Sequence, residues 1–152
     1  MVQVQNILWL TDFSQDSVHA LAYARTLAEL YKTKLYLMHV IENPTSGIYG
    51  RVDGDYLAME ANAREKARTW LQEYAAKELR DFSNYEILLH EGDILPKIIE
   101  VEAGKAIGTI VVGTHGRTGL AHMLLGSITE KVIRSVHCPV YVIRHPERAT
   151  KR

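Results

Sequence analysis

Short apolar runs alternate along the chain with longer segments whose apolar residues recur every three or four positions. The recurrence predicts amphipathic helices, and the uninterrupted apolar runs are typical of strands buried on both faces. The expected strands are residues 6–11, 34–41, 84–90, 108–113 and 138–144, and the expected helices are residues 14–32, 56–81, 94–104 and 127–136. This βαβαβαβαβ order predicts an α/β fold, with a five-stranded parallel sheet, helices on both of its faces and right-handed crossovers.

The chain has a size that folds as one domain, and we assign residues 1–152 to it. Apolar residues make up 47% of the sequence, which is enough for a real core. Residues 42–55, rich in glycine, form the longest irregular stretch, where we expect a mobile loop or lid. The polar residues 146–152 are expected to form a frayed tail.

Charge and cysteine content exclude several classes of protein. Eighteen Lys and Arg residues balance eighteen Asp and Glu residues, whereas a nucleic-acid binder usually carries a basic excess. No apolar run approaches the roughly 18 residues of a membrane span, and the N-terminus lacks the features of a signal peptide. The single cysteine, Cys138, excludes an internal disulfide and favours a reducing compartment. We therefore expect a cytoplasmic protein in which Cys138 is a buried structural thiol.

A glycine-rich stretch joins the fourth expected strand to the fourth expected helix. Gly113, Gly116 and Gly126 follow the spacing G-x2-G-x9-G, and Ser127 comes directly after them. We expect Gly113 to let a ligand approach the backbone, Gly116 to take a positive φ, and Gly126 to leave the helix N-terminus open. The first N–H groups of a helix lack internal partners and lie at the positive end of its dipole. The stretch therefore predicts a phosphate site. The alternative is that the glycines only terminate secondary structure.

Ser127 has a second expected role in the same helix. The run Ser127-Ile128-Thr129-Glu130 matches a capping box, in which a serine caps the first turn and a glutamate reaches back to it. Capping and phosphate contact are compatible at one helix end, so we expect Ser127 to do both.

Other nucleotide loops and catalytic patterns are missing. There is no G-x4-G-K-[ST], which excludes a P-loop NTPase, and no G-x-G-x-x-G after the first strand, which argues against a dinucleotide-binding enzyme. No nucleophile–base–orienter pattern or protein metal site is visible. His39 is expected to be a hydrogen-bonded core residue. His115 could act on a phosphate, with a surface-loop histidine as the alternative.

These motifs resemble those of the universal stress protein family, of its nucleotide-binding type, over nearly the whole chain. The family signature G-2x-G-9x-G-[S/T] is met by Gly113, Gly116, Gly126 and Ser127. The flanking runs IVVGTHGRTG and LLGSITEKVIRSVHCPVYVIR are highly characteristic, and the opening ILWLTDFS and the run LMHVIE also fit. The resemblance implies a Rossmann-like fold, similar to the adenine nucleotide alpha hydrolases.

The resemblance also implies a site for ATP, with ADP or AMP as alternatives, and Mg²⁺ or Mn²⁺ held through the phosphates. Adenine would lie against the ends of the first two strands, the ribose beside the fourth strand, and the phosphates in the glycine-rich loop and at the helix that follows. The implied binding residues are Leu10, Thr11, Asp12, Val40, Val112, Gly113, His115, Gly116, Arg117, Gly126, Ser127, Ile128 and Thr129.

Family members usually dimerise by pairing their last strands, which implies a homodimer through residues 138–144. The implied function is that of a dimeric, nucleotide-dependent module of the stress response, with an unknown protein partner. Two alternatives stay open: a slow ATPase or phosphotransferase that uses the same pocket, and a partner-binding module whose pocket is empty.

Overall fold

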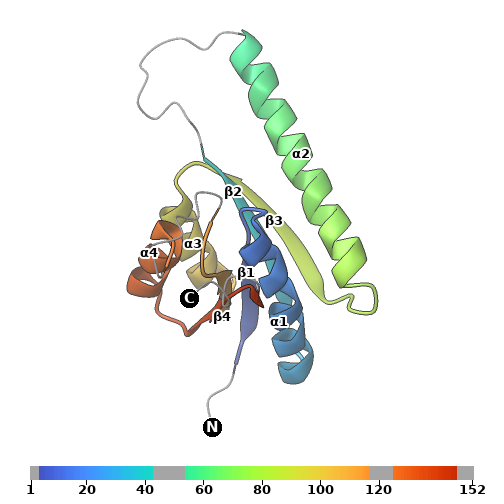
Figure 1. Ribbon diagram of the computed structural model, residues 1–152, viewed down its shortest axis with the longest axis vertical. Coiled ribbons are helices and arrows are strands. Elements are labelled where there is room, and N and C mark those ends of the chain that lie inside the picture. The colour runs from blue at the N-terminus through green and yellow to red at the C-terminus, as the bar shows by residue number, and fades with distance from the viewer. Residues whose placement is uncertain (1–3, 43–53, 117–124, 147–152) are drawn as a thin grey trace.

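The computed structural model describes residues 4–42, 54–116 and 125–146, and in residues 54–60 only the backbone. In chain order the elements are β1 (Asn6–Leu10), α1 (Gln15–Tyr31), β2 (Leu35–Ile41), α2 (Gly54–Glu78), β3 (Tyr85–Glu91), α3 (Ile94–Gly104), β4 (Ile107–Gly113), α4 (Ser127–Ser135) and β5 (Val140–Ile143). The predicted alternation is confirmed (Figure 1). The expected loop 42–55 and tail 146–152 lie largely outside the described residues.

The five strands form one parallel sheet in the order β3-β2-β1-β4-β5. The chain enters at the central strand β1, adds β2 and β3 on one side, and then crosses to β4 and β5 on the other side. The strand order therefore reverses between β1 and β4. Ligands of open parallel sheets bind outside the carboxyl ends of the strands at such a reversal.

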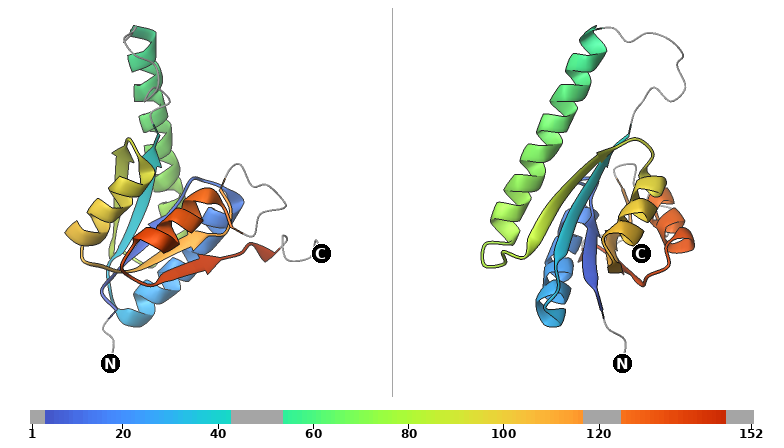
Figure 2. Two further views of the ribbon diagram at one scale, coloured as in Figure 1. Left: turned by 90° about the vertical axis from the view of Figure 1, so that its left-hand side faces the viewer. Right: turned by 180° about the vertical axis from the view of Figure 1, so that it is seen from behind.

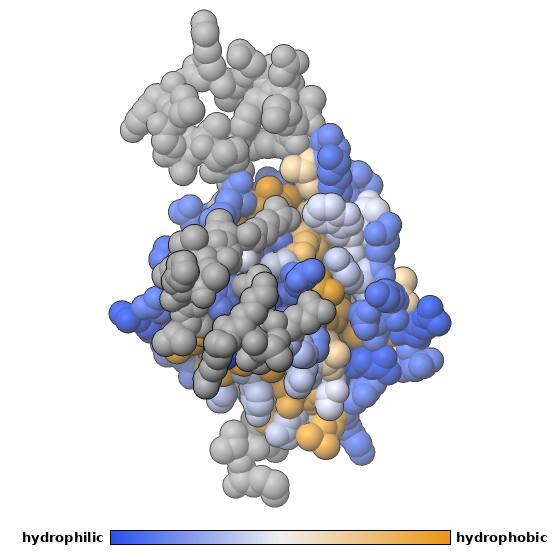
Figure 3. Space-filling model, in the orientation of Figure 1, coloured by the Kyte–Doolittle hydropathy of each residue, from blue (hydrophilic) through white to orange (hydrophobic). Residues whose placement is uncertain are grey.

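The helices cover both faces of the sheet, as predicted. Helices α1 and α2 lie on one face, and α3 and α4 lie on the other (Figure 2). Because side chains alternate along a strand, Ile7 and Trp9 pack toward α1 and α2, while Leu8 and Leu10 pack toward α3 and α4. Among the coloured residues of Figure 3 hydrophilic ones prevail, and apolar ones form a narrow strip between them.

The observed element ends differ from the predicted ones by a few residues. Ser14 caps α1 by accepting a hydrogen bond from the Ser17 N–H (3.3 Å), and Lys32 ends that helix in a left-handed conformation, with φ of 54°. Strand β5 begins at Val140, two residues later than the predicted strand 138–144. Pro139 precedes it and has no N–H to donate to the neighbouring strand.

A buried carboxylate holds the turn that leads into β5. Glu102 on α3 accepts hydrogen bonds from the backbone N–H groups of His137 (2.7 Å) and Cys138 (2.8 Å). Burial alone would raise the pKa of Glu102, but these two donors outweigh it and the pKa lies below its ordinary value. Burial, followed by the nearby Glu102 carboxylate, raises the pKa of the Cys138 thiol to about 12. A raised pKa disfavours the reactive thiolate, which supports the predicted structural role, but Cys138 is half-buried and not buried as predicted.

Within the described residues, no helix combines the length and the apolar character needed to cross a membrane.

Candidate functional site

A cavity of about 780 Å³ opens at the carboxyl ends of β1, β2 and β4, where the strand order reverses. The strand ends form its floor, and the N-terminus of α4 forms one wall. Residues of α2 and α3 complete the walls from the two opposite faces of the sheet. The predicted position of the site, outside the ends of these three strands, coincides with this cavity.

The structure brings all the described members of the predicted site to this one cavity. Arg117 lies outside the described residues. Those that line the cavity are Leu10, Thr11, Asp12, Val40, Val112, Gly113, His115, Gly116, Gly126, Ser127, Ile128 and Thr129. They come from β1, β2, β4, the segment after β4 and the start of α4, so the fold joins segments more than 80 residues apart. Their contact with a nucleotide stays a prediction.

Packing within the protein constrains Gly113, and the ligand approach expected there stays a prediction. A Cβ atom at this position would lie 2.7 Å from the backbone carbon of Asp16 and 2.7 Å from the backbone nitrogen of Ser17. Glycine therefore lets the start of α1 pack directly on the end of β4. The predicted approach of a ligand is not needed to explain this residue.

The positive φ predicted for Gly116 is wrong. Among the described glycines only Gly92 has a positive φ. A Cβ atom at Gly116 would lie 2.7 Å from Oδ2 of Asp12. The constraint is again close approach, here between the segment after β4 and the carboxylate that follows β1.

Gly126 lies at the junction of this segment and α4. Its N–H donates a 2.7 Å hydrogen bond to the Thr114 carbonyl, and its extended backbone, with φ of −69° and ψ of 154°, places it at the N-cap. A Cβ atom here would lie 3.3 to 3.4 Å from the backbone of residues 114–116. The start of α4 and the segment after β4 are therefore in contact.

The capping box predicted at Ser127 is wrong. The N-cap is Gly126, no side chain caps the helix, and Ser127 is the first helical residue. The Glu130 carboxylate pairs with Arg134 at 2.9 Å, one turn further on, and does not reach back. The N-cap with its extended backbone is Gly126, one position before the predicted N-cap Ser127, and no side-chain capping bond forms. Ser127 instead lines the cavity.

Thr129, by contrast, has its hydroxyl occupied. Its Oγ1 donates a 2.9 Å hydrogen bond to the Gly113 carbonyl, and the residue is buried. This bond fixes α4 against the end of β4. The Thr129 hydroxyl is therefore not available to a phosphate, and the donor that this residue can offer is its backbone N–H in the first turn of α4.

The end of β1 is held by short-range hydrogen bonds. Asp12 Oδ1 accepts from the Ser14 N–H at 3.0 Å, and Thr11 Oγ1 lies 2.9 Å from Ser17 Oγ. His39 Nδ1 lies 2.7 Å from the Thr11 carbonyl, so the predicted hydrogen bond is confirmed. The predicted core position of His39 is wrong, because the residue is half-buried and lines the cavity. Phe13 has a φ of 63°, which is uncommon for a bulky residue.

The sequence reasoning did not find the wall contributed by α2. Trp70, Lys66 and Ala67 line the cavity, and Trp70 packs edge-on against Phe13 with a centroid distance of 4.9 Å. In the helical repeat of residues 56–81 Trp70 falls among the apolar positions, which predicts burial, yet it is 43% exposed. Periodicity gives the face of a helix but not where that helix crosses the sheet, so no sequence signal placed it here.

A buried acid near the start of α1 was also missed. Asp16 is fully buried, and its Oδ2 accepts hydrogen bonds from the Thr114 hydroxyl at 2.6 Å and from the His115 N–H at 3.2 Å. The His115 side chain is only 11% exposed, so the alternative of a surface-loop histidine is wrong. An acidic residue in the first turn of a helix is so common that the sequence alone did not single out Asp16.

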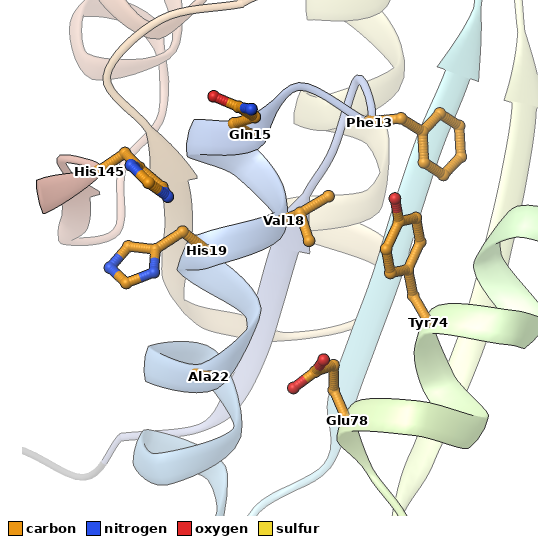
Figure 4. Close-up of a pocket in the computed structure, with 8 residues that line it drawn as sticks. All are labelled: Phe13, Gln15, Val18, His19, Ala22, Tyr74, Glu78 and His145. Carbon is orange, nitrogen blue, oxygen red and sulfur yellow. The ribbon is translucent and has the colours of Figure 1, made fainter. Parts of the chain in front are cut away.

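A smaller hollow of about 440 Å³ lies beside α1 (Figure 4), and Phe13 lines both this hollow and the larger cavity. Gln15 and His19 of α1, Tyr74 and Glu78 of α2, and His145 lie around it. Among the described residues, no group of three or more His, Cys, Asp or Glu side chains is placed to hold a metal ion, here or in the larger cavity.

Comparisons with known proteins agree with the fold. A model of the universal stress protein family matches residues 3–144. Universal stress protein MJ0531 of Methanocaldococcus jannaschii is 30% identical over 143 residues, covering 91% of this chain and 81% of that protein. The solved structure of hypothetical protein MJ0577 of the same organism has a TM-score of 0.82 at 25% identity, covering 95% of this chain and 98% of that one.

A further solved structure shares the fold at lower identity. The universal stress protein from Archaeoglobus fulgidus in complex with dAMP has a TM-score of 0.59 at 20% identity, covering 94% of this chain and 99% of that one. The family match spans most of the chain. The chain belongs to the universal stress protein family.

Proposed function

We propose that this protein binds an adenine nucleotide in the 780 Å³ cavity and acts as a nucleotide-dependent module of the stress response. ATP is the proposed ligand, with ADP and AMP as alternatives. One observation carries the proposal: the open N-terminus of α4 and the apolar ends of β1, β2 and β4 line the same cavity. Such a cavity offers donors for phosphates at one end and apolar surface for a base at the other.

The phosphate end is proposed at α4. Gly126 is the N-cap and no side chain caps the helix, so the first-turn N–H groups of Ser127, Ile128 and Thr129 have no intrahelical partner. The dipole of this nine-residue helix favours negative charge at that end. Lys131, one turn further along, also lines the cavity and supplies a positive charge.

The base end is proposed between β1 and β2. Leu10 and Val40 are buried and line the cavity together with Ile94 and Ile98 of α3. Apolar surface of this kind suits a purine ring. The dAMP complex of the Archaeoglobus fulgidus protein, which has this fold, supports an adenine nucleotide as the ligand class.

A divalent ion is proposed to bind through the phosphate oxygens. The described residues offer no cluster of three or more ligating side chains, so a resident protein-held ion does not fit them. Mg²⁺ in nucleotide sites commonly keeps several waters and binds through substrate phosphates. When bound, the ion would offset the negative charge of the phosphates.

Calorimetry tests the proposal. Mg-ATP is expected to bind with a Kd of about 10 μM, or about −7 kcal/mol, and GTP and CTP at least ten-fold more weakly. Binding should also change the fluorescence of Trp70, which lines the cavity, whereas Trp9 is fully buried. The Trp70→Phe variant is the control, because it should lose the fluorescence change and keep the heat. A folded protein that gives no heat with Mg-ATP, ADP or AMP contradicts the proposal.

We also propose a homodimer that forms through β5. This strand is at the edge of the sheet, and its Tyr141 is 44% exposed. An uncovered edge strand presents unpaired backbone groups to a second copy. The cytoplasmic location also stays a prediction.

Sedimentation tests the dimer. The wild type is expected at twice the chain mass, and Tyr141→Lys at the monomer mass, because charge on an edge strand opposes pairing. Tyr31→Lys, at a 42% exposed position at the end of α1, is the matched control and should stay dimeric. A monomeric wild type at micromolar concentration contradicts the proposal.

A further inference from the structure

The cavity has an aromatic wall that the proposed phosphate and base ends do not use. Trp70 on α2 lines the cavity and is 43% exposed. Among the described residues it is the only exposed large hydrophobic side chain that lines this cavity. An indole in a concave site offers a large, rigid apolar surface that a ligand can cover. The position of Trp70 therefore points to a contact with the bound molecule.

Helix α2 turns one face toward the cavity. The four residues of α2 that line it are spaced three and four positions apart, so they lie on the same side of the helix: Ala63, Lys66, Ala67 and Trp70. Ala67 is 4% exposed and belongs to the core between α2 and the sheet, which fixes this part of the helix. The two alanines are small, so Trp70 supplies most of the apolar surface of this wall.

Further aromatic rings support Trp70 from the sheet side. The Phe13 ring lies 4.9 Å from the Trp70 ring at an interplanar angle of 70°, and it also packs against His39 at 4.6 Å and Tyr74 at 6.1 Å. Figure 4 shows Phe13 above the Tyr74 side chain. Phe13 has a φ of 63°, a strained conformation that persists only where the surrounding structure enforces it. A platform held in this way loses little conformational freedom when a ligand binds.

The wall opposite Trp70 is aliphatic. Ile94 and Ile98 of α3 line the cavity from the other face of the sheet, and the ends of β1 and β2 form the floor between α3 and α2. A planar ring above this floor therefore has aliphatic side chains on one side and the Trp70 indole on the other. This is the part of the cavity where the base of the nucleotide is proposed to lie.

We propose that Trp70 stacks on the base of the bound nucleotide and makes the cavity select purines over pyrimidines. This inference rests on the proposed nucleotide binding, and it adds a residue of α2 to a site otherwise built from β1, β2, β4, α3 and α4. Stacking grows with the area of the rings in contact, so a two-ring purine gains more from Trp70 than a one-ring pyrimidine. The contact does not involve the phosphates, so Trp70 contributes the same factor to the binding of ATP, ADP and AMP.

Calorimetry on Trp70→Ala with a set of ligands tests the stacking. The Kd values for Mg-ATP, ADP and AMP should each rise about ten-fold, because removal of an aromatic ring from beside one base costs about that factor. Inorganic tripolyphosphate, which has no base, should bind equally to the variant and the wild type. The preference for ATP over CTP should fall about three-fold or more. The preference for ATP over GTP should stay the same, because both bases are purines.

Conservative variants separate stacking from a structural role. Trp70→Phe keeps an aromatic ring and should bind ATP within about three-fold of the wild type, whereas Trp70→Leu keeps apolar bulk without a ring and should behave as Trp70→Ala does. Tyr23→Ala removes an aromatic side chain that is 48% exposed and does not line the cavity, so it is the matched control. Urea unfolding identifies a variant that fails to fold, and Trp70→Leu then takes the place of Trp70→Ala.

Two results overturn the stacking of Trp70. One is a folded Trp70→Ala protein with wild-type affinity for ATP. The other is a loss of affinity by the same factor for ATP, CTP and tripolyphosphate, which would show that Trp70 only maintains the shape of the cavity. Absence of ATP, ADP and AMP binding in the folded wild type overturns the proposed function as well.

Discussion

Ser127→Asp is expected to weaken ATP binding at least about a hundred-fold while the folded protein stays as stable as the wild type. Ser127 is the first residue of α4 and lines the cavity at the proposed phosphate end. Two negative unit charges, here a carboxylate and a phosphate, repel by about 4 kcal/mol at a separation of about 4 Å and an effective dielectric constant of about 20. About two thirds of that energy corresponds to a hundred-fold loss of affinity. The same carboxylate lies at the positive end of the helix dipole and should stabilise α4 by about 0.3–1 kcal/mol.

Ser127→Asp is expected to weaken ATP binding and to stabilise α4, so a loss of binding cannot be explained by a loss of folding. Ser135→Asp introduces the same charge at the last residue of α4 and is the matched control, since it should leave the Kd unchanged. Ser127→Ala should cost little stability, because the serine does not cap the helix. Calorimetry gives the Kd and urea unfolding gives the stability. If Ser127→Asp binds Mg-ATP as the wild type does, the phosphates do not lie at this helix end.

Gly113→Val is expected to lower the free energy of unfolding by about 3 kcal/mol or more, and to lose nucleotide binding only as a consequence of that. The first added carbon would already lie 2.7 Å from two backbone atoms of Asp16 and Ser17, well inside contact distance. Neither backbone atom can move without displacing α1 from β4. The larger valine side chain adds further overlap in the same place.

Urea unfolding of Gly113→Ala and Gly104→Ala provides the comparison. Gly104 is the last residue of α3, and a Cβ atom there would meet nothing within 4 Å. Alanine at Gly104 should therefore be neutral or stabilising by up to about 1 kcal/mol, whereas alanine at Gly113 should be clearly destabilising. A Gly113→Ala protein with wild-type stability but impaired ATP binding would return this glycine to the ligand-contact role that its sequence position suggests.

Much of the fold and the membership of the site could be predicted because they depend on local patterns. Strands such as β1 and β4 are buried on both faces and read as uninterrupted apolar runs, while α1 shows a helical repeat. The carboxyl ends of parallel strands meet at one edge of the sheet, so predicted residues on β1, β2 and β4 had to come together there.

The reasons behind individual residues were less predictable. The glycine spacing is conspicuous in the sequence, but it does not say whether a missing Cβ makes room for a ligand or for the protein's own backbone. At Gly113 and Gly116 the near neighbours are Asp16 and Asp12. Ser127 was assigned a capping role because its motif fits, and a shift of one residue in the helix start removed that role.

The sequence by itself determined the order of strands and helices, the family, and the group of residues that lies at the sheet edge, because periodicity and spacing are properties of the chain. Only the tertiary structure showed that Asp16 reaches His115 through Thr114, and that α2 brings Trp70 to the cavity. The contact of Trp70 with Phe13 joins residues 57 positions apart and that of Asp16 with Thr114 joins residues 98 apart, and both depend on how α1 and α2 cross the sheet. Packing geometry sets those crossings, and no local pattern of residues encodes them.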